Sequence, residues 1–436
     1  MSSNKLFSRL LDSFSLYKGL PRAVWMLFIC NFINGLGAFV HPFLTLYLTV
    51  RLGLFDGRAG LFIMLLATCY VPGALIGGRI ADKFDRKKTV FLSQLGITAV
   101  LIACGILEGR QVMLWILLLM EVFDGICDPA RDAIAQDITT LENRQASFSL
   151  MYLAGNLGFI VGPLIAGVLF FKAIRWIFWG TGIASSISLI ILMVFIPESK
   201  PDNARIERSM ESNDSDKAEK GGLWKALSTR KSLLMFALGI MFFSTAYSQV
   251  LFGLPLTLVR RFGEMGSTLY GTVNSLNGLI CTISTAPLVA LLHHGNPLKN
   301  VMLSGMFFVI GFSFIGLLNA PWMFFIVAIA FTLGEVIQTT NSRPYIANNT
   351  PITHRARFQS VLPVIMFSGS AFGPMIAGFV SQNLGLNYIW PFSSVLIIIG
   401  SMIVCGVYIH DSRQKKQIQI PKSEFLKNPM IKSSPS

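Results

Sequence analysis

Apolar stretches of about 20 residues recur from one end of this chain to the other, and each is long enough to cross a membrane as a helix. Hydrophobic residues make up 53% of the 436 positions and charged residues only 13%. Soluble domains carry about a quarter charged residues, and a soluble core does not explain such regular recurrence. The sequence therefore predicts an all-α membrane protein.

We place twelve membrane-spanning helices at residues 23–49, 59–79, 89–107, 111–135, 149–171, 176–196, 232–258, 268–292, 300–318, 322–342, 358–380 and 389–409. Between Glu198 and Lys231, 15 of 34 residues are charged, a composition typical of a flexible linker. The predicted organisation is a cytoplasmic segment (1–22), a six-helix bundle (23–197), a linker (198–231), a second six-helix bundle (232–409) and a tail (410–436).

The net charge of +14 reflects orientation in a membrane, because the basic residues lie between the apolar stretches. With both termini in the cytoplasm, 29 of the 36 Lys and Arg residues fall on the cytoplasmic side. No nucleic-acid partner is expected. The seven exceptions are Arg51, Arg58, Arg110, Lys172, Arg175, Arg260 and Arg261.

A glycine–proline run in the fifth span is repeated 211 residues later in the eleventh. Glycine lets helices approach closely, and proline bends a helix. The repeat predicts two pseudo-symmetric halves with a site between them, although tight packing alone also explains such a run. The residues are Gly158, Gly162, Pro163 and Gly167, matched by Gly369, Gly373, Pro374 and Gly378.

The fourth span carries five charged residues on one helical face: Glu121, Asp124, Asp128, Arg131 and Asp132. An ionised carboxylate near the membrane centre costs at least about 2.5–3.5 kcal/mol, so several on one face indicate function or pairing. Arg131 lies one turn from Asp128 and is expected to neutralise it. Glu121 and Asp124 have no cation on their own helix.

The turn after the second span reads Gly78-Arg-Ile-Ala-Asp82-Lys83-Phe-Asp85-Arg86. It resembles the Gly-x-x-x-Asp-Arg/Lys-x-Gly-x-Arg/Lys-Arg/Lys signature of the major facilitator superfamily, with Asp85 where the family has Gly. The glycine–proline run and Gly334-Glu335 are similar to sequences of its twelve-span drug:proton antiporters, a bacterial multidrug efflux group. The resemblance covers residues 20–410. It departs in the fourth span, where related antiporters carry an Arg that is absent here.

The charges of this turn and of the fourth span form a candidate conformational latch, although they can also serve only to orient the chain. Its residues are Gly78, Asp82, Lys83, Arg86, Asp128 and Arg131. The resemblance further implies that spans 1, 4, 7 and 10 line a central cavity. The polar candidates there, any of which can instead make an interhelical hydrogen bond, are Asn31, Asn34, Glu121, Asp124, Tyr247, Gln249, Glu335 and Gln338.

We interpret the chain as a proton-coupled antiporter that exports amphipathic or cationic small molecules, as a monomer in a bacterial plasma membrane. No enzymatic activity, metal or cofactor is expected; the proton is the coupling ion. Burial disfavours a charged carboxylate, so the candidate coupling residues are Glu121 or Asp124 first and Glu335 second. An importer or facilitator of a metabolite, sugar or peptide, and a lipid flippase, remain alternatives.

The six cysteines all fall inside predicted spans, and we expect them to be reduced packing residues. They are Cys30, Cys69, Cys104, Cys127, Cys281 and Cys405.

Overall fold

The structure, a computed structural model, describes residues 17, 19–83, 85–140, 143–197, 231–292, 295–349 and 355–425, and all its regular elements are helices. The predicted linker, except Lys231, lies outside the described residues. The first group of α-helices is α2 (Arg22–Leu36), α3 (Val40–Leu46), α4 (Asp56–Lys83), α5 (Arg86–Ile106), α6 (Met113–Asp137), α7 (Arg144–Lys172) and α8 (Arg175–Phe195). The second is α11 (Lys231–Tyr247), α12 (Gly253–Phe262), α13 (Glu264–Leu292), α14 (Pro297–Ser313), α15 (Pro321–Asn349), α16 (Arg355–Leu384) and α17 (Ile389–Phe425).

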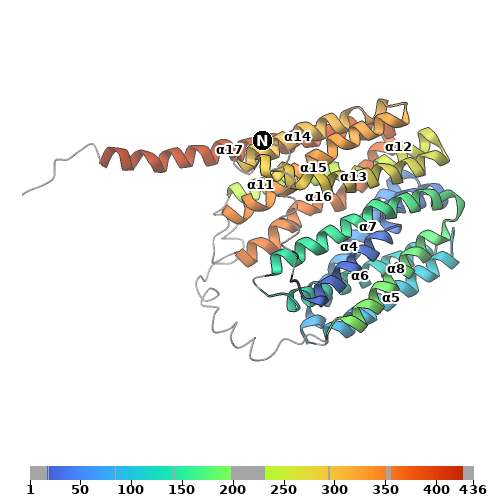
Figure 1. The fold of residues 1–436 in the computed structure, drawn as a ribbon. Coiled ribbons are helices and arrows are strands. Elements are labelled where there is room, and N and C mark those ends of the chain that lie inside the picture. Colours follow the sequence, from blue (N-terminus) through green and yellow to red (C-terminus); the bar gives the residue numbers. More distant parts are fainter. Residues whose placement is uncertain are drawn as a thin grey trace, which may run out of the picture.

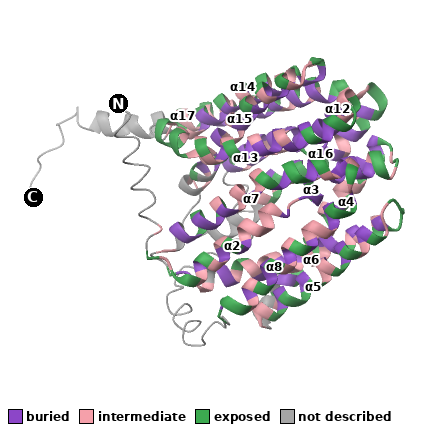
Figure 2. Ribbon diagram, turned by 45° about the vertical axis from the view of Figure 1, so that its right-hand side comes forward, coloured by how far each residue is buried: buried purple, intermediate pink, exposed green. Residues whose placement is uncertain are grey.

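Eleven helical segments of the described chain are long and apolar enough to cross a membrane. The helix α6 covers the predicted fourth span but is not among them, because its acidic residues lower its apolar character. Large apolar side chains are exposed, including Trp115 at 74% and Leu291 at 75%. Exposed residues recur along many of the helices (Figure 2). Such surfaces are typical of helices that face lipid.

Two predicted continuous spans are broken near their middles. The first is interrupted between Leu36 and Val40 and ends in a π-helix, η1 (Tyr47–Arg51). The seventh is interrupted by a 3₁₀ turn, η2 (Ser248–Val250), before α12. The breaks occupy corresponding places in the two groups, which agrees with the internal repeat.

The residue Asp85 occupies the position where the family signature has glycine. It adopts an extended conformation with φ of −65°, so no left-handed turn is needed there. Its carboxylate accepts hydrogen bonds from the backbone N–H groups of Lys87 (2.9 Å) and Lys88 (3.3 Å). Asp85 is therefore the N-cap of α5, a role that stabilises a helix by about 1 kcal/mol.

The two helix groups meet along two long contacts, α4 with α16 and α7 with α13 (Figure 1). The glycine–proline runs lie at these contacts. A Cβ added at Gly271 of α13 would collide with the carbonyl oxygen of Pro163, and one at Gly60 of α4 would collide with that of Pro374. Because only glycine leaves room for the backbone of the opposing helix, these glycines set how closely the two groups approach each other at the runs.

The same runs also pack within their own groups. Gly158 and Gly162 lie against the backbone of α2, near Gly35 and Leu36. Gly373 lies against Ser248 of η2, directly after α11. Each run therefore joins three helices, and it does so in corresponding ways in the two groups.

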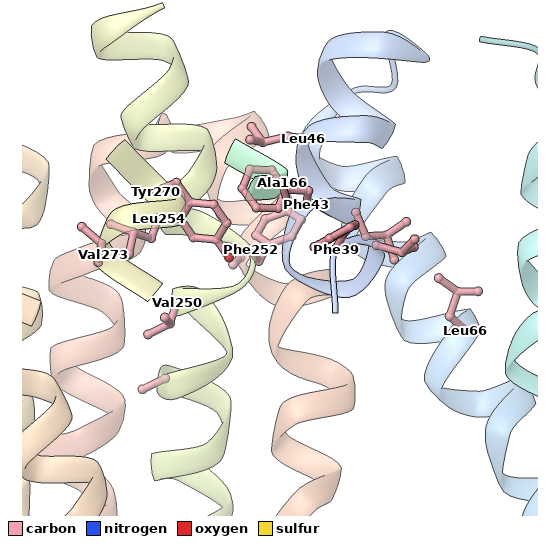
Figure 3. Packing of buried hydrophobic residues seen from close by; sticks show 14 of the residues in the cluster. Phe39, Phe43, Leu46, Leu66, Ala166, Val250, Phe252, Leu254, Tyr270 and Val273 are labelled. Carbon is pink, nitrogen blue, oxygen red and sulfur yellow. The ribbon is translucent and has the colours of Figure 1, made fainter. Parts of the chain in front are cut away.

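The hydrogen bonds that join the two groups all lie at the predicted outer end, within the described residues. Asp56 accepts from both Arg260 and Ser381, and Ser267 donates to the carbonyl of Gly167 at 2.9 Å. Between these bonds lies an apolar cluster, in which the rings of Phe43 and Tyr270 meet edge to face at 5.2 Å (Figure 3). The structure is therefore closed at the predicted outer end.

Candidate functional site

The acidic residue Glu121 is buried where α6 meets α3. Its carboxylate lies 3.9 Å from Nδ1 of His41, whose own side chain is 60% exposed. That distance is too long for a hydrogen bond, so Glu121 has a nearby ionisable neighbour but no direct donor in the described chain. His41 lies at the start of α3, directly after the break that follows α2.

One turn further along α6, Asp124 is half-buried. Within the described part of the chain it makes neither a hydrogen bond nor an ion pair. A carboxylate inside a membrane protein without a cation partner is stable only when it meets water, a proton or a bound cation. Asp124 therefore keeps its place among the candidate coupling residues.

The residues Asp128 and Arg131 belong to a network that ties α6 to α4 and α5. The Asp128 carboxylate lies 3.6 Å from the Arg131 guanidinium and accepts from the Tyr70 hydroxyl at 2.9 Å. Arg131 also donates to Oε1 of Gln94 at 2.7 Å, and Gln94 donates to the carbonyl of Ser185 at 3.2 Å. Asp128 is thus neutralised, as the sequence spacing predicted, while Tyr70 and Gln94 were not anticipated.

The predicted latch is described only in part. The side chains of Gly78, Asp82 and Lys83 lie outside the described residues. Arg86 forms an ion pair with Asp137, which joins the start of α5 to the end of α6. The sequence had singled out Arg86 without identifying this partner.

The second group of helices contains the other candidate, Glu335 of α15, which is half-buried. Its carboxylate accepts from the Asn277 amide of α13 at 2.9 Å and from the Cys281 thiol at 3.8 Å. The Tyr247 hydroxyl of α11 also lies close to this carboxylate. The Asn277 amide is shared with the Thr332 hydroxyl, again at 2.9 Å. Glu335 thus has neutral polar neighbours from two other helices, α11 and α13, and no cation pairs with it within the described residues.

Of the remaining cavity candidates, Asn31 and Asn34 line a pocket, whereas Gln338 bonds within its own helix. Asn31 and Asn34 line a pocket of about 250 Å³ in the first group, together with Arg131 and Asp132. Gln338 donates to Ser342 on its own helix at 3.3 Å.

The side chain of Gln249 is buried and donates to the carbonyl of Gly373 at 3.2 Å. Its predicted place in the cavity is therefore not what the structure shows; it occupies a packing position between η2 and α16.

All six cysteines are free thiols, as predicted. We expect a cysteine-free variant to fold and to transport like the parent, because no disulfide is lost and each change is small in volume. Uptake assays on the purified variant check this. Loss of transport in a folded variant would reveal a functional thiol, and Cys281 beside Glu335 would be examined first.

Comparison with known proteins gives consistent matches over most of the chain. Residues 27–341 and 287–434 match the model of the Major Facilitator Superfamily. The uncharacterised MFS-type transporter YqjV of Bacillus subtilis is 23% identical, over 89% of this chain and 93% of its own. A Na(+), Li(+), K(+)/H(+) antiporter of Planococcus maritimus is 22% identical, over 87% and 92%.

Two further proteins are similar over only part of the chain or in fold alone. The quinolone resistance protein NorA of Staphylococcus aureus is 25% identical over 52% of this chain and 58% of its own. The crystal structure of the nucleoside transporter NupG superposes with a TM-score of 0.70 at 14% identity, covering 89% of this chain and 99% of that one. At that identity the superposition shows a shared fold alone.

Proposed function

Because this chain belongs to the Major Facilitator Superfamily and is a multi-pass membrane transporter rather than an enzyme, we propose that it exchanges protons for cationic or amphipathic small molecules. In this proposal α6 also crosses the membrane and brings the number of spans to twelve. The two helix groups are six-helix bundles that alternate access to a site between them. Both termini lie in the cytoplasm of a bacterial cell, and the monomer is the working unit.

The observation that carries the proposal is the environment of Glu335. A half-buried carboxylate that accepts hydrogen bonds from α13 and has a neutral tyrosine of α11 beside it is held in place but not neutralised. A proton or a cationic substrate completes such a site, and occupancy by one disfavours the other. Competition of this kind couples the two fluxes without direct contact between substrate and proton.

The carboxylates of α6 supply the same chemistry on the other side of the proposed site. Glu121 and Asp124 add negative character, which attracts a cation before it reaches either group. Asp128 adds no negative charge to the site, because it pairs with Arg131 and accepts a hydrogen bond from Tyr70. We therefore assign proton coupling to Glu335 together with Glu121 or Asp124, with no further cofactor.

The similarities to known proteins support exchange but divide over the cargo. NorA is described as a quinolone resistance protein, whereas the Planococcus relative is described as an alkali-cation/proton antiporter and matches more of the chain. Alkali cations favour oxygen ligands, and the Glu335 carboxylate lies beside the hydroxyls of Thr332 and Tyr247. A small inorganic cation is therefore the second candidate cargo.

Uptake into inverted membrane vesicles tests the proposal. We expect a labelled lipophilic cation to accumulate when the vesicle interior is acidic, and accumulation to stop when the gradient is collapsed. If sodium is exchanged instead, the same gradient drives sodium uptake. Equal uptake with and without the gradient would contradict exchange and favour a facilitator or a lipid flippase.

A further inference from the structure

The outward face of the second helix group carries a groove between α14 and α17, with a volume of about 490 Å³. Gly305 and Ser401 form its floor: a Cβ at Gly305 would collide with the Ser401 hydroxyl, so the helices cross closely there. Its walls are flexible and apolar. Met306 is 63% exposed and Met402 is 67% exposed, so the groove opens to the surroundings of the protein and not to its interior.

The groove leads to basic residues at the predicted cytoplasmic end. Lys299 lies one turn before Met302, a wall residue on the same face of α14. Its ammonium group lies 5.2 Å from the ring centroid of Tyr408, so it reaches across to α17. On α17, Arg413 follows Cys405 by about two turns and is exposed.

This mouth has an unbalanced positive charge. Neither Lys299 nor Arg413 pairs with a carboxylate within the described residues. The nearest acidic residue on α17, Asp411, is directed toward the neighbouring helices α11 and α15. There it accepts hydrogen bonds from Ser232 at 2.8 Å and from Tyr345 at 2.9 Å. The apolar groove therefore ends at positively charged side chains.

The corresponding groove of the first group provides an internal comparison. It lies between α5 and α8, has a volume of about 410 Å³ and is lined by Trp176 and Trp179. The basic residue beside these tryptophans, Arg175, lies at the predicted outer end and is neutralised by Glu108 at 2.7 Å. The fold thus produces an apolar groove twice, and the basic residue beside the tryptophans of the α5–α8 groove is already paired.

We propose that the α14–α17 groove binds one anionic phospholipid of the cytoplasmic leaflet. An acyl chain lies in the groove, and the phosphate contacts Lys299 and Arg413. A zwitterionic phospholipid presents the same chains but also a cationic group, so it gains less at this mouth.

Native mass spectrometry of the full-length protein in detergent, with phosphatidylglycerol or phosphatidylcholine added, tests this site. Each basic residue near an anionic surface contributes about a factor of five, so we expect phosphatidylglycerol to be preferred about thirtyfold. The double variant Lys299→Gln/Arg413→Gln should lose that preference. The matched variant Arg175→Gln, at the other groove, should retain it.

A second variant separates the groove from the charges. Met306→Trp adds bulk at an exposed position and should reduce retention of the lipid without disturbing the helix crossing. Equal binding of the two lipids to the parent would overturn the proposal, as would an unchanged preference in the double variant together with unchanged lipid retention in Met306→Trp. Displacement of the lipid by ethidium, equally well in the parent and the double variant, would assign the groove to a lipophilic cation instead.

Discussion

Replacing Glu335 by Gln is expected to abolish the dependence of transport on the proton gradient while leaving folding and membrane insertion intact. Glutamine has nearly the same shape and can still bond to Asn277 and Tyr247, but it carries no charge and no exchangeable coupling proton. Loss of a charged hydrogen-bonding partner weakens binding by about 1.5–3 kcal/mol, so the affinity for a cation should fall roughly tenfold or more. Vesicle uptake and equilibrium binding measure the two effects.

The matched control is Glu264→Gln, which makes the same chemical change at an exposed residue of α13. It should transport like the parent. If Glu335→Gln keeps its gradient dependence, Glu121→Gln and Asp124→Asn decide whether the coupling lies on α6. Normal proton coupling in all three variants would show that the coupling scheme is wrong.

The second large effect is expected at the predicted outer end, where Arg260→Gln should favour opening. The Asp56 side chain is only 5% exposed, and Arg260 is its sole cationic partner within the described residues. Removing one partner of a buried pair costs about 3–5 kcal/mol, but Arg260 is half exposed, so we expect about 2 kcal/mol. That loss corresponds to a shift of roughly thirtyfold toward the open form.

Labelling by a membrane-impermeant maleimide measures this shift. The reporter is Phe43→Cys in the cysteine-free background, because Phe43 is buried in the outer apolar cluster. The control is Arg261→Gln, since Arg261 donates to the carbonyl of Gly316 at 2.8 Å in its own helix group and leaves Asp56 paired. Equal labelling of the Arg260 variant and the parent would show that this pair does not hold the outer end closed.

Much of the fold follows from local patterns in the sequence. The length of the apolar stretches predicts helices, and each predicted span is covered by a helix or by a pair of helices. The glycine–proline repeat correctly indicated close helix contacts, because small residues are needed wherever backbones approach. The pairing of Asp128 with Arg131 was also predictable, since both lie on one helix at a spacing of three residues.

The unanticipated features join residues distant in the sequence. Nothing local to Arg86 identifies Asp137 as its partner, and nothing local to Asp56 identifies Arg260. Nothing in the sequence around Asn277 identifies Glu335 as its partner, and only the crossing of α13 with α15 brings the two side chains together. The assignment of Gln249 failed for the same reason, because span membership does not determine which neighbour a side chain meets.

The most direct test of the proposed exchange is substrate-induced proton release from the purified protein in weakly buffered detergent solution. A cation that displaces a proton from Glu335 should acidify the medium, and its apparent affinity should rise with pH because fewer protons compete. The Glu335→Gln variant should release fewer protons than the parent. Binding of the cation to the parent protein without any release, and with an affinity that does not change with pH, would contradict the account.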